Sequence, residues 1–332
     1  MTRALVLGAA GFIGGHIARQ ALDLGWEVRG LRRRPGAFGH LDPAAPLRWF
    51  DGDLDRPATL PAAFDGVEIV FHAAAFYPRS TRAVPRQVAR AVRQTRSVLD
   101  ACRAAGIRRL VYTSSLSTIG PPPPGADRPA DERDHYTPGR HPRSAYYECK
   151  YAMESEVLRA AADPEVLVLC PTAVFGPGDV HRAMGGLLLA VAAGRVPFWF
   201  EAAVNAVDVR DVAAAHLRAA QVGRPGERTI LGGHNLRLRE LLRAAAEVAG
   251  VAPPRLRLAL AALDLAVALD DALPFGRGLG NHLRAVREWP FYDSRKAARE
   301  LGLQPRPLAD TLRDALAWYA SRTARPDPLP VV

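Results

Sequence analysis

The sequence predicts a doubly wound α/β fold, in which one parallel sheet is covered by helices on both faces. Two observations predict it. Short apolar segments alternate with helical stretches, and a glycine-rich turn joins the first apolar segment to the first helix. Alternation of this kind requires right-handed crossovers, which distribute the helices over the two faces. In such sheets, ligands bind beyond the carboxyl ends of the strands.

Each element is assigned from its own pattern. Strands read as short apolar runs, and helices read as longer stretches with apolar residues three or four positions apart. The expected strands are residues 3–7, 27–31, 47–50, 67–71, 109–113 and 166–169, and the expected helices are 15–24, 57–64, 84–105 and 145–161.

The first strand runs directly into a turn that contains Gly8, Gly11 and Gly14, with Phe12 and Ile13 between the last two. Glycines allow the backbone to turn tightly and to approach a pyrophosphate, whose charge is met by the amides at the start of the following helix. The spacing is GxxGxxG rather than GxGxxG, but its position at the first strand-to-helix turn favours a dinucleotide site over a simple tight turn. The expected fold is therefore a Rossmann fold.

Beyond residue 172 the alternation breaks, and the chain returns to sheet-like segments near Val204 and Thr229. We therefore expect a smaller substrate-binding domain that is interleaved with the sheet. The expected dinucleotide-binding domain is residues 1–171 with about 204–232, and the expected substrate domain is residues 172–203 with 233–332.

The end of the second strand bears on the choice of nucleotide. Arg32, Arg33 and Arg34 stand where an acidic residue would accept the ribose hydroxyls of NAD. Guanidinium groups match a 2′-phosphate in charge and geometry, so NADP(H) is preferred, and NAD(H) stays open because arginine is abundant throughout the chain. After the third strand, the carboxylate of Asp53 either accepts a hydrogen bond from adenine or caps the helix near residue 57.

Tyr146 and Lys150 lie four residues apart in an expected helix, so their side chains share one face. Of the 44 basic residues only Lys150 and Lys296 are lysines, which indicates that position 150 requires a compact ammonium. An ammonium beside a phenol lowers its pKa from about 10, as a tyrosine acid or base requires. A tyrosine and a lysine at this spacing also occur on ordinary solvent-exposed helices. Residues 146–150 alone do not distinguish a catalytic pair from such a helix.

Several motifs together resemble the extended short-chain dehydrogenase/reductases, the NAD-dependent epimerase/dehydratase family. The likeness runs nearly end to end and, within the family, is closest to dihydroflavonol-4-reductase-like proteins and hopanoid-associated sugar epimerases. The motifs that carry it are residues 8–14, 52–54, 71–75, 112–115, 146–150, 170–177 and 207–213, with 225–233 and 301–307 for the closer likeness.

The resemblance implies that Tyr146 is the catalytic acid or base, that Lys150 holds the nicotinamide ribose, and that Ser115 hydrogen-bonds the reacting oxygen. Ser115 is preferred to Ser114 because it lies five residues before Gly120, although such serines also satisfy loop amides. The implied cofactor-binding residues are Gly8, Gly11, Phe12, Ile13, Gly14, Arg32, Arg33, Asp53, Leu54, Ala73, Ala74, Ala75, Thr113, Tyr146, Lys150, Pro171 and Val174.

The chain departs from the family at Ala91 and Gln94, where an asparagine and a glycine are usual, and at Cys149, where a serine usually stands. The first departure puts ordinary catalytic efficiency in doubt. Substrate contacts are expected from Ser115 and from a proline-rich rim or lid at residues 120–142, and Tyr77 offers either packing or a substrate contact. The aromatic run 198–200 offers either packing or substrate surface, and residues 256–273 form either a packed helix or a partner surface.

Composition excludes several classes of function. The net charge is +10, but the arginines are scattered and no nucleic-acid-binding motif accompanies them, so no nucleic-acid role is expected. No apolar run reaches the roughly 18 residues of a membrane span, and a cytoplasmic enzyme with a small-molecule substrate is expected. Cys102, Cys149 and Cys170 lack metal-ligand spacing, and no metal is expected.

The resemblance implies a homodimer through helices that flank the sheet.

Three functions remain open at this stage. The first is a reductase or dehydrogenase that uses NADP(H) on a carbonyl or alcohol carbon. The second is a nucleotide-sugar epimerase or dehydratase that retains its cofactor, for which Arg195, Arg237 and Arg239 offer cationic groups toward a diphosphate. The third is a non-catalytic dinucleotide-binding sensor.

Overall fold

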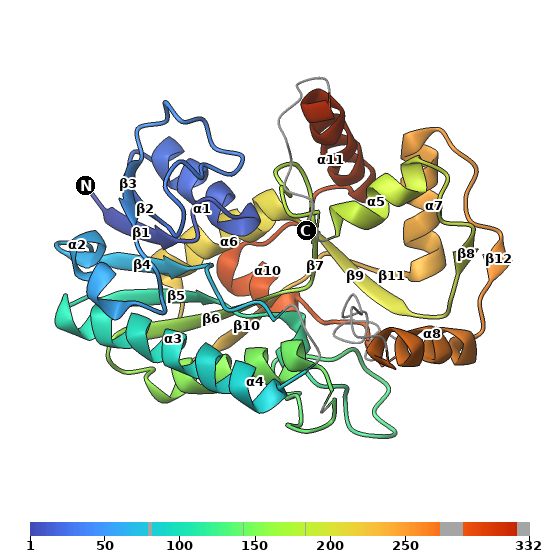
Figure 1. Ribbon diagram of the computed structural model, residues 1–332, viewed down its shortest axis with the longest axis horizontal. Helices are drawn as coiled ribbons and strands as arrows, with labels where there is room; N and C mark the ends of the chain where they lie inside the picture. The colour runs from blue at the N-terminus through green and yellow to red at the C-terminus, as the bar shows by residue number, and fades with distance from the viewer. Residues whose placement is uncertain (79–81, 142, 183, 273–287, 324–332) are drawn as a thin grey trace.

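The computed structural model describes residues 1–78, 82–141, 143–182, 184–272 and 288–323. A seven-stranded parallel sheet forms one lobe, and a smaller α/β lobe lies beside it (Figure 1). The strand order is β10-β6-β5-β4-β1-β2-β3, so the chain runs outward from β1 in both directions. The strands are β1 (Arg3–Leu7), β2 (Glu27–Arg32), β3 (Arg48–Asp51), β4 (Ile69–His72), β5 (Arg109–Thr113), β6 (Glu165–Pro171) and β10 (Arg228–Leu231).

Both faces of the large sheet are buried, because successive side chains of each strand enter different hydrophobic clusters. Leu5 and Leu7 of β1 pack toward α3 (Val84–Ala104) and α4 (Ala145–Arg159). Ala4 and Val6 pack toward α1 (Phe12–Asp23) and α6 (Val209–Val222), which α10 (Arg295–Leu301) joins. This arrangement confirms the doubly wound Rossmann fold.

The smaller lobe is built from segments that leave and re-enter the large sheet. Its strands are β7 (Ala173–Phe175), β8 (Phe198–Trp199), β9 (Ala203–Asp208), β11 (His234–Arg237) and β12 (Leu256–Arg257), and its helices are α5 (Gly185–Ala192), α7 (Leu238–Ala249), α8 (Leu260–Ala272) and α11 (Leu308–Thr323). The strand β9 pairs with β7 and β11, so residues 203–208 belong to the small sheet and the chain rejoins the large lobe at α6. The chain therefore passes back and forth between the two sheets, and residues 204–208, expected in the dinucleotide-binding domain, pair within the small sheet.

The element boundaries lie close to those expected from periodicity. The strand expected at 166–169 extends to Pro171, where it still pairs with Leu231. The helix expected at 57–64 is divided into a 3₁₀ turn, η1 (Pro57–Thr59), and α2 (Pro61–Phe64), because Pro61 cannot donate a backbone hydrogen bond. Leu273, the last residue of the apolar run, lies outside the described residues. No helix within the described ranges has both the length and the apolar character to cross a membrane.

Candidate active site

The glycine turn forms a close-packed cradle at the carboxyl end of β1. Gly8 has a φ of +84°, which favours glycine, and its carbonyl accepts the Gly11 amide at 2.8 Å. A Cβ atom at Gly14 would lie 2.2 Å from the Gly8 carbonyl oxygen. The helix α1 begins after Gly11 without a side-chain cap, so its first amides remain available to an anion. The turn therefore fits the pyrophosphate of a dinucleotide, with Phe12 and Ile13 in the first turn of the helix.

Small residues after β4 continue this cradle. A Cβ atom at Gly8 would lie 3.0 Å from the carbonyl oxygen of Ala73, so the ends of β1 and β4 approach each other closely. Ala73, Ala74 and Ala75 are half-buried and add little side-chain volume. The hydroxyl of Thr113, by contrast, contacts Nε2 of His216 at 2.9 Å and is turned toward α6.

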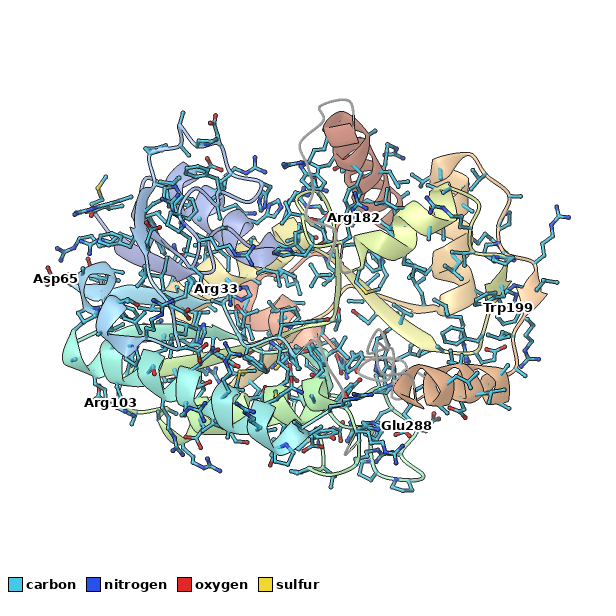
Figure 2. All side chains as sticks on the ribbon, in the orientation of Figure 1. Arg33, Asp65, Arg103, Arg182, Trp199 and Glu288 are labelled. Atoms are coloured by element: carbon cyan, nitrogen blue, oxygen red, sulfur yellow. The ribbon has the colours of Figure 1, made fainter. Side chains whose placement is uncertain are left out.

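At the end of β2, Arg32 and Arg33 differ in their surroundings. The Arg32 Nε lies 2.7 Å from a carboxylate oxygen of Asp51, and the Arg32 guanidinium stacks over Phe38 and Trp49 at 4.9 and 5.2 Å from their ring centroids. Arg33 is exposed, and Figure 2 places it in the middle of the molecule beside the carboxyl ends of the strands. Arg33 is thus the better placed of the two residues for a phosphate.

The local role of Asp53 is a turn rather than a helix cap. Its carboxylate accepts the Asp55 amide at 3.1 Å, and η1 begins after Arg56 without a side-chain cap. Leu54 is buried beneath this turn. Pro171 and Val174 lie at the end of β6 and in β7, where the chain passes from the large sheet to the small one.

The structure brings together the three residues that were expected to react. Tyr146 and Lys150 occupy successive turns of α4, and Ser115 precedes the 3₁₀ turn η2 (Leu116–Thr118) at the end of β5. The Ser115 Oγ lies 3.0 Å from the Tyr146 Oη and accepts the Ser117 amide at 3.2 Å. The hydroxyl of Ser114 points away and hydrogen-bonds to Glu154. This geometry supports Ser115 over Ser114.

Burial is the largest influence on the pKa values of Tyr146 and Lys150. It lowers the pKa of Lys150 to about 8, against the opposing effect of the Glu154 carboxylate. It raises the pKa of Tyr146 above its ordinary value, while hydrogen bonds from Ser115 and Ser117 act in the other direction. The sequence led us to expect a lowered Tyr146 pKa. The structure differs because loss of hydration outweighs those hydrogen bonds.

Aromatic side chains lie next to Tyr146. The exposed ring of Tyr77 lies 5.4 Å from that of Tyr146, and the Trp289 Nε1 donates to the Tyr147 Oη at 2.7 Å. Tyr136 packs against Tyr147, with ring centroids 5.5 Å apart. Trp289 and Tyr136 were not singled out from the sequence, because nothing in their local pattern links them to Tyr146.

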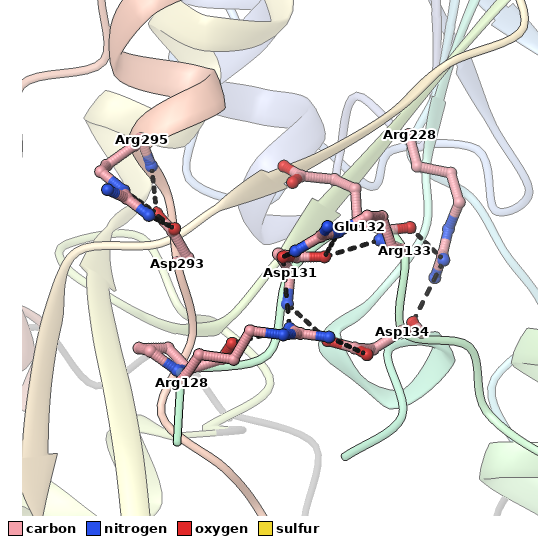
Figure 3. Close-up of polar contacts among 9 residues, drawn as sticks. Arg128, Asp131, Glu132, Arg133, Asp134, Arg228, Asp293 and Arg295 are labelled. Atoms are coloured by element: carbon pink, nitrogen blue, oxygen red, sulfur yellow. Dashed lines mark hydrogen bonds and ion pairs between the residues drawn. The ribbon is translucent and has the colours of Figure 1, made fainter. Parts of the chain in front are cut away.

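The expected rim is a closed loop that is attached to the core at two places. At its neck Ile119 pairs with His135, and at its tip the Ala130 amide donates to the Phe291 carbonyl at 2.8 Å. Figure 3 shows the charged side chains that hold the turn after the tip, where Arg128 binds Asp134 with N–O distances of 2.7 and 2.8 Å. Pro142, the expected end of the rim, lies outside the described residues.

The first departure from the family, Ala91 and Gln94, lies on α3. Ala91 is buried and offers no polar side-chain group, and its carbonyl accepts the Thr95 hydroxyl at 3.0 Å. Gln94 is buried as well, and its side chain hydrogen-bonds to Asp55. In the part of the chain that the structure describes, no group of three or more His, Cys, Asp or Glu side chains is arranged to hold a metal ion.

The sequence is similar to those of known proteins over most of its length. Residues 4–232 match the NAD dependent epimerase/dehydratase family. The chain is 32% identical to a putative dihydroflavonol 4-reductase of Synechocystis sp., over 95% of this chain and 93% of the relative. It is also 32% identical to sterol demethylase protein B of Methylococcus capsulatus, over 96% of this chain and 98% of the relative.

A solved structure of a nucleoside-diphosphate-sugar epimerase from Pseudomonas aeruginosa is similar over 97% of this chain and 98% of its own, with a TM-score of 0.79 and 26% identity. The family match covers more than half of the sequence, including the glycine turn and the Ser115, Tyr146 and Lys150 positions. The chain therefore belongs to the NAD dependent epimerase/dehydratase family and is an NAD(P)-dependent oxidoreductase of the extended short-chain dehydrogenase/reductase type.

Proposed function

We propose that this enzyme reduces a carbonyl carbon, or oxidises the corresponding alcohol, in a small molecule with an apolar or aromatic body, and that it prefers NADP(H). Ser115, Tyr146 and Lys150 are the reacting residues in this proposal. The observation that carries it is the 3.0 Å approach of the Ser115 and Tyr146 hydroxyls, with Lys150 buried one turn further along α4.

Each residue has a distinct chemical task. When bound in the glycine cradle, the nicotinamide cofactor supplies the hydride for reduction or accepts it in oxidation. Tyr146 donates its phenolic proton to the carbonyl oxygen, and its raised pKa keeps that proton in place at neutral pH. Ser115 donates a hydrogen bond to the same oxygen as negative charge develops on it. The Lys150 ammonium stabilises the tyrosinate that remains.

The preference for NADP(H) rests on Arg33. Arg32 is engaged by Asp51 and by two aromatic rings, whereas Arg33 is exposed beside the strand ends. A guanidinium there can pair with a 2′-phosphate. Titration of the purified protein with NADPH and NADH tests this preference, and tighter binding of NADH would contradict it.

The aromatic residues around Tyr146 favour a substrate with an apolar or aromatic body. Of the three arginines considered for a diphosphate, Arg239 stacks on Trp199 at 5.0 Å, and Figure 2 places Trp199 at the outer end of the small lobe. Arg237 stacks on Phe291 at 5.7 Å. Two of the three cations are thus held against aromatic rings.

A nucleotide-sugar epimerase is the second candidate, and the likeness to the Pseudomonas aeruginosa epimerase favours it. Net oxidation of added NADPH by a panel of ketones and aldehydes is expected only of a reductase. Interconversion of a nucleotide sugar without net consumption of cofactor would support the epimerase instead. The homodimer remains a proposal, which sedimentation analysis tests directly.

The catalytic assignment is tested with Y146F, for which Y147F is the matched control. Y146F should lower kcat by about a thousandfold or more while cofactor still binds, because the proton donor is lost. Tyr147 is buried beside Tyr146, and its hydroxyl accepts the Trp289 N–H, so Y147F should retain most activity. Equal activity of Y146F and the wild type would refute the assignment.

A further inference from the structure

Glu154 is a buried carboxylate that the mechanism above does not use. It lies on α4 one turn after Lys150, and its side chain is 5% exposed. Three donors converge on its Oε2 atom: the hydroxyl of Ser114, the hydroxyl of Thr118 at 2.7 Å, and the thiol of Cys170 at 3.6 Å. Ser114 and Thr118 lie on either side of Ser115 in sequence. Glu154 therefore ties the turn that carries Ser115 to the helix that carries Tyr146.

Arg228 of β10 pairs with this carboxylate. Its Nε lies 2.9 Å from the Glu154 Oε1, although the N–H does not point directly at the oxygen, and its side chain is also 5% exposed. The remaining nitrogens donate to the Thr118 carbonyl at 2.7 Å and the Glu132 carbonyl at 3.1 Å, and one lies 3.0 Å from the His135 Nδ1. Figure 3 shows Arg228 reaching to the Glu132–Asp134 turn. The same guanidinium thus holds both Glu154 and the neck of the rim loop.

Stability alone is a poor explanation for a buried ion pair. Removing two charges from water is costly, and well-packed apolar residues often serve stability as well or better. The position of the pair suggests another role, because Tyr146, Lys150 and Glu154 follow each other at intervals of four on one face of α4.

Cys149, Cys170 and His72, which interact electrostatically with Lys150, are neutral at pH 7. Burial raises the pKa of Cys149 on α4 and of Cys170 on β6 to about 12. Burial lowers the pKa of His72 on β4 to about 3. Among these neighbours, Glu154 supplies the negative charge that opposes the desolvation of the ammonium.

We propose that Glu154 is a positioning residue of the active site, which holds the Ser115 turn on α4 and supplies the counter-charge of Lys150, and that Arg228 holds Glu154 in place. The proposal rests on the proposed roles of Ser115 and Lys150. It assigns Arg228 an opposing electrostatic effect, because its positive charge partly neutralises the carboxylate that Lys150 faces.

The small number of lysines makes the proposal testable without a substrate. The chain contains only Lys150 and Lys296, so protein labelled with ¹³C at lysine Cε gives two lysine signals whose shifts report each pKa. K296R assigns the signals. The Lys296 Nζ lies 2.8 Å from the Glu227 carboxylate and donates to the Arg228 carbonyl, so its signal is an internal control.

Three variants separate a charge effect from a packing effect. E154Q removes the negative charge and should lower the Lys150 pKa by about one unit. R228Q removes the opposing positive charge and should raise that pKa. E154D keeps the charge while drawing it back from Ser114 and Thr118, so it should shift the Lys150 pKa less than E154Q does. The Lys296 titration should not move in E154Q or E154D.

An unchanged Lys150 titration in E154Q would overturn the proposal, and so would equal shifts in E154Q and E154D. If R228Q does not fold because it leaves a buried unpaired carboxylate, the two Glu154 variants still decide the matter. A purely structural pair would lower stability without moving the Lys150 pKa. Since the titration involves no turnover, its result is independent of the Y146F experiment.

Discussion

Arg32 and Asp51 are direct partners across the parallel strands β2 and β3, and their side chains form an ion pair with a 2.7 Å N–O distance. The pair lies at the edge of the sheet, at the end of the second strand and next to the proposed cofactor site. In the NADP(H) site that we propose, the carboxylate restrains an arginine that would otherwise be available to the 2′-phosphate, and it adds negative charge close to that phosphate.

We predict that D51N tightens the binding of NADPH by roughly three- to tenfold while the affinity for NADH stays nearly constant. The change removes a carboxylate near the expected phosphate and releases Arg32, an effect of about 1 kcal/mol. Fluorescence titration with both nucleotides measures it. D100N, at an exposed ion pair on α3, is the control and should alter neither affinity. Weaker NADPH binding in D51N would contradict this prediction and show that the Arg32–Asp51 ion pair contributes to NADPH binding.

The buried lysine should set an alkaline limit to catalysis. Its pKa is lowered to about 8, so Lys150 is charged below that pH and loses its charge above it. We expect kcat/KM for carbonyl reduction to be level below about pH 7.5 and to fall above pH 8 as the tyrosinate loses its stabilising cation. A profile of kcat/KM from pH 6 to 10 measures this decrease. A constant kcat/KM up to pH 10 would contradict a role for the Lys150 charge.

Acid should destabilise the protein through buried histidines. The His40 ring packs against that of His16 with centroids 4.5 Å apart and a tilt of 32°. Both His40 nitrogens lack a hydrogen-bond partner within the described residues, and burial lowers the pKa of His40 to about 3. Because the folded-state pKa lies below the unfolded value of about 6.5, the unfolded chain binds the proton first as the pH falls. The free energy of unfolding is therefore fully retained above pH 6.5 and decreases as the pH falls toward 3.

H40F should therefore reduce the dependence of unfolding free energy on pH between 6.5 and 4, by up to about 1.4 kcal/mol per pH unit. Urea unfolding at several pH values measures this slope. H181F, which replaces an exposed histidine, is the control substitution. If H40F has the wild-type slope, His40 is not the group that acid titrates.

The glycine cradle should not tolerate a methyl group at position 14. G14A places a Cβ atom 2.2 Å from the Gly8 carbonyl oxygen, so the turn must shift, at a cost of roughly 1–3 kcal/mol. Binding of either dinucleotide should weaken at least tenfold. G186A is the matched helical control, since its Cβ would lie 3.8 Å from the Arg182 Cβ, an ordinary van der Waals contact. Wild-type cofactor binding in G14A would exclude the cradle as the pyrophosphate site.

The local features of this protein follow from the sequence alone. The strand and helix alternation, the glycine turn at Gly8 and the shared face of Tyr146 and Lys150 each depend on residues within a few positions of one another. Backbone sterics and side-chain periodicity act over that range, so these features can be read from the printed chain.

Tertiary structure decided which distant groups meet. Ser115 reaches Tyr146 across 31 residues, and Arg228 reaches Thr118 across 110. The direction of the Tyr146 pKa shift, the engagement of Arg32 by Asp51 and the fixed rim loop likewise depend on packing between separate elements. No short-range pattern encodes these contacts, because burial and charge at each position are set by side chains that only the folded sheet and its crossovers bring together.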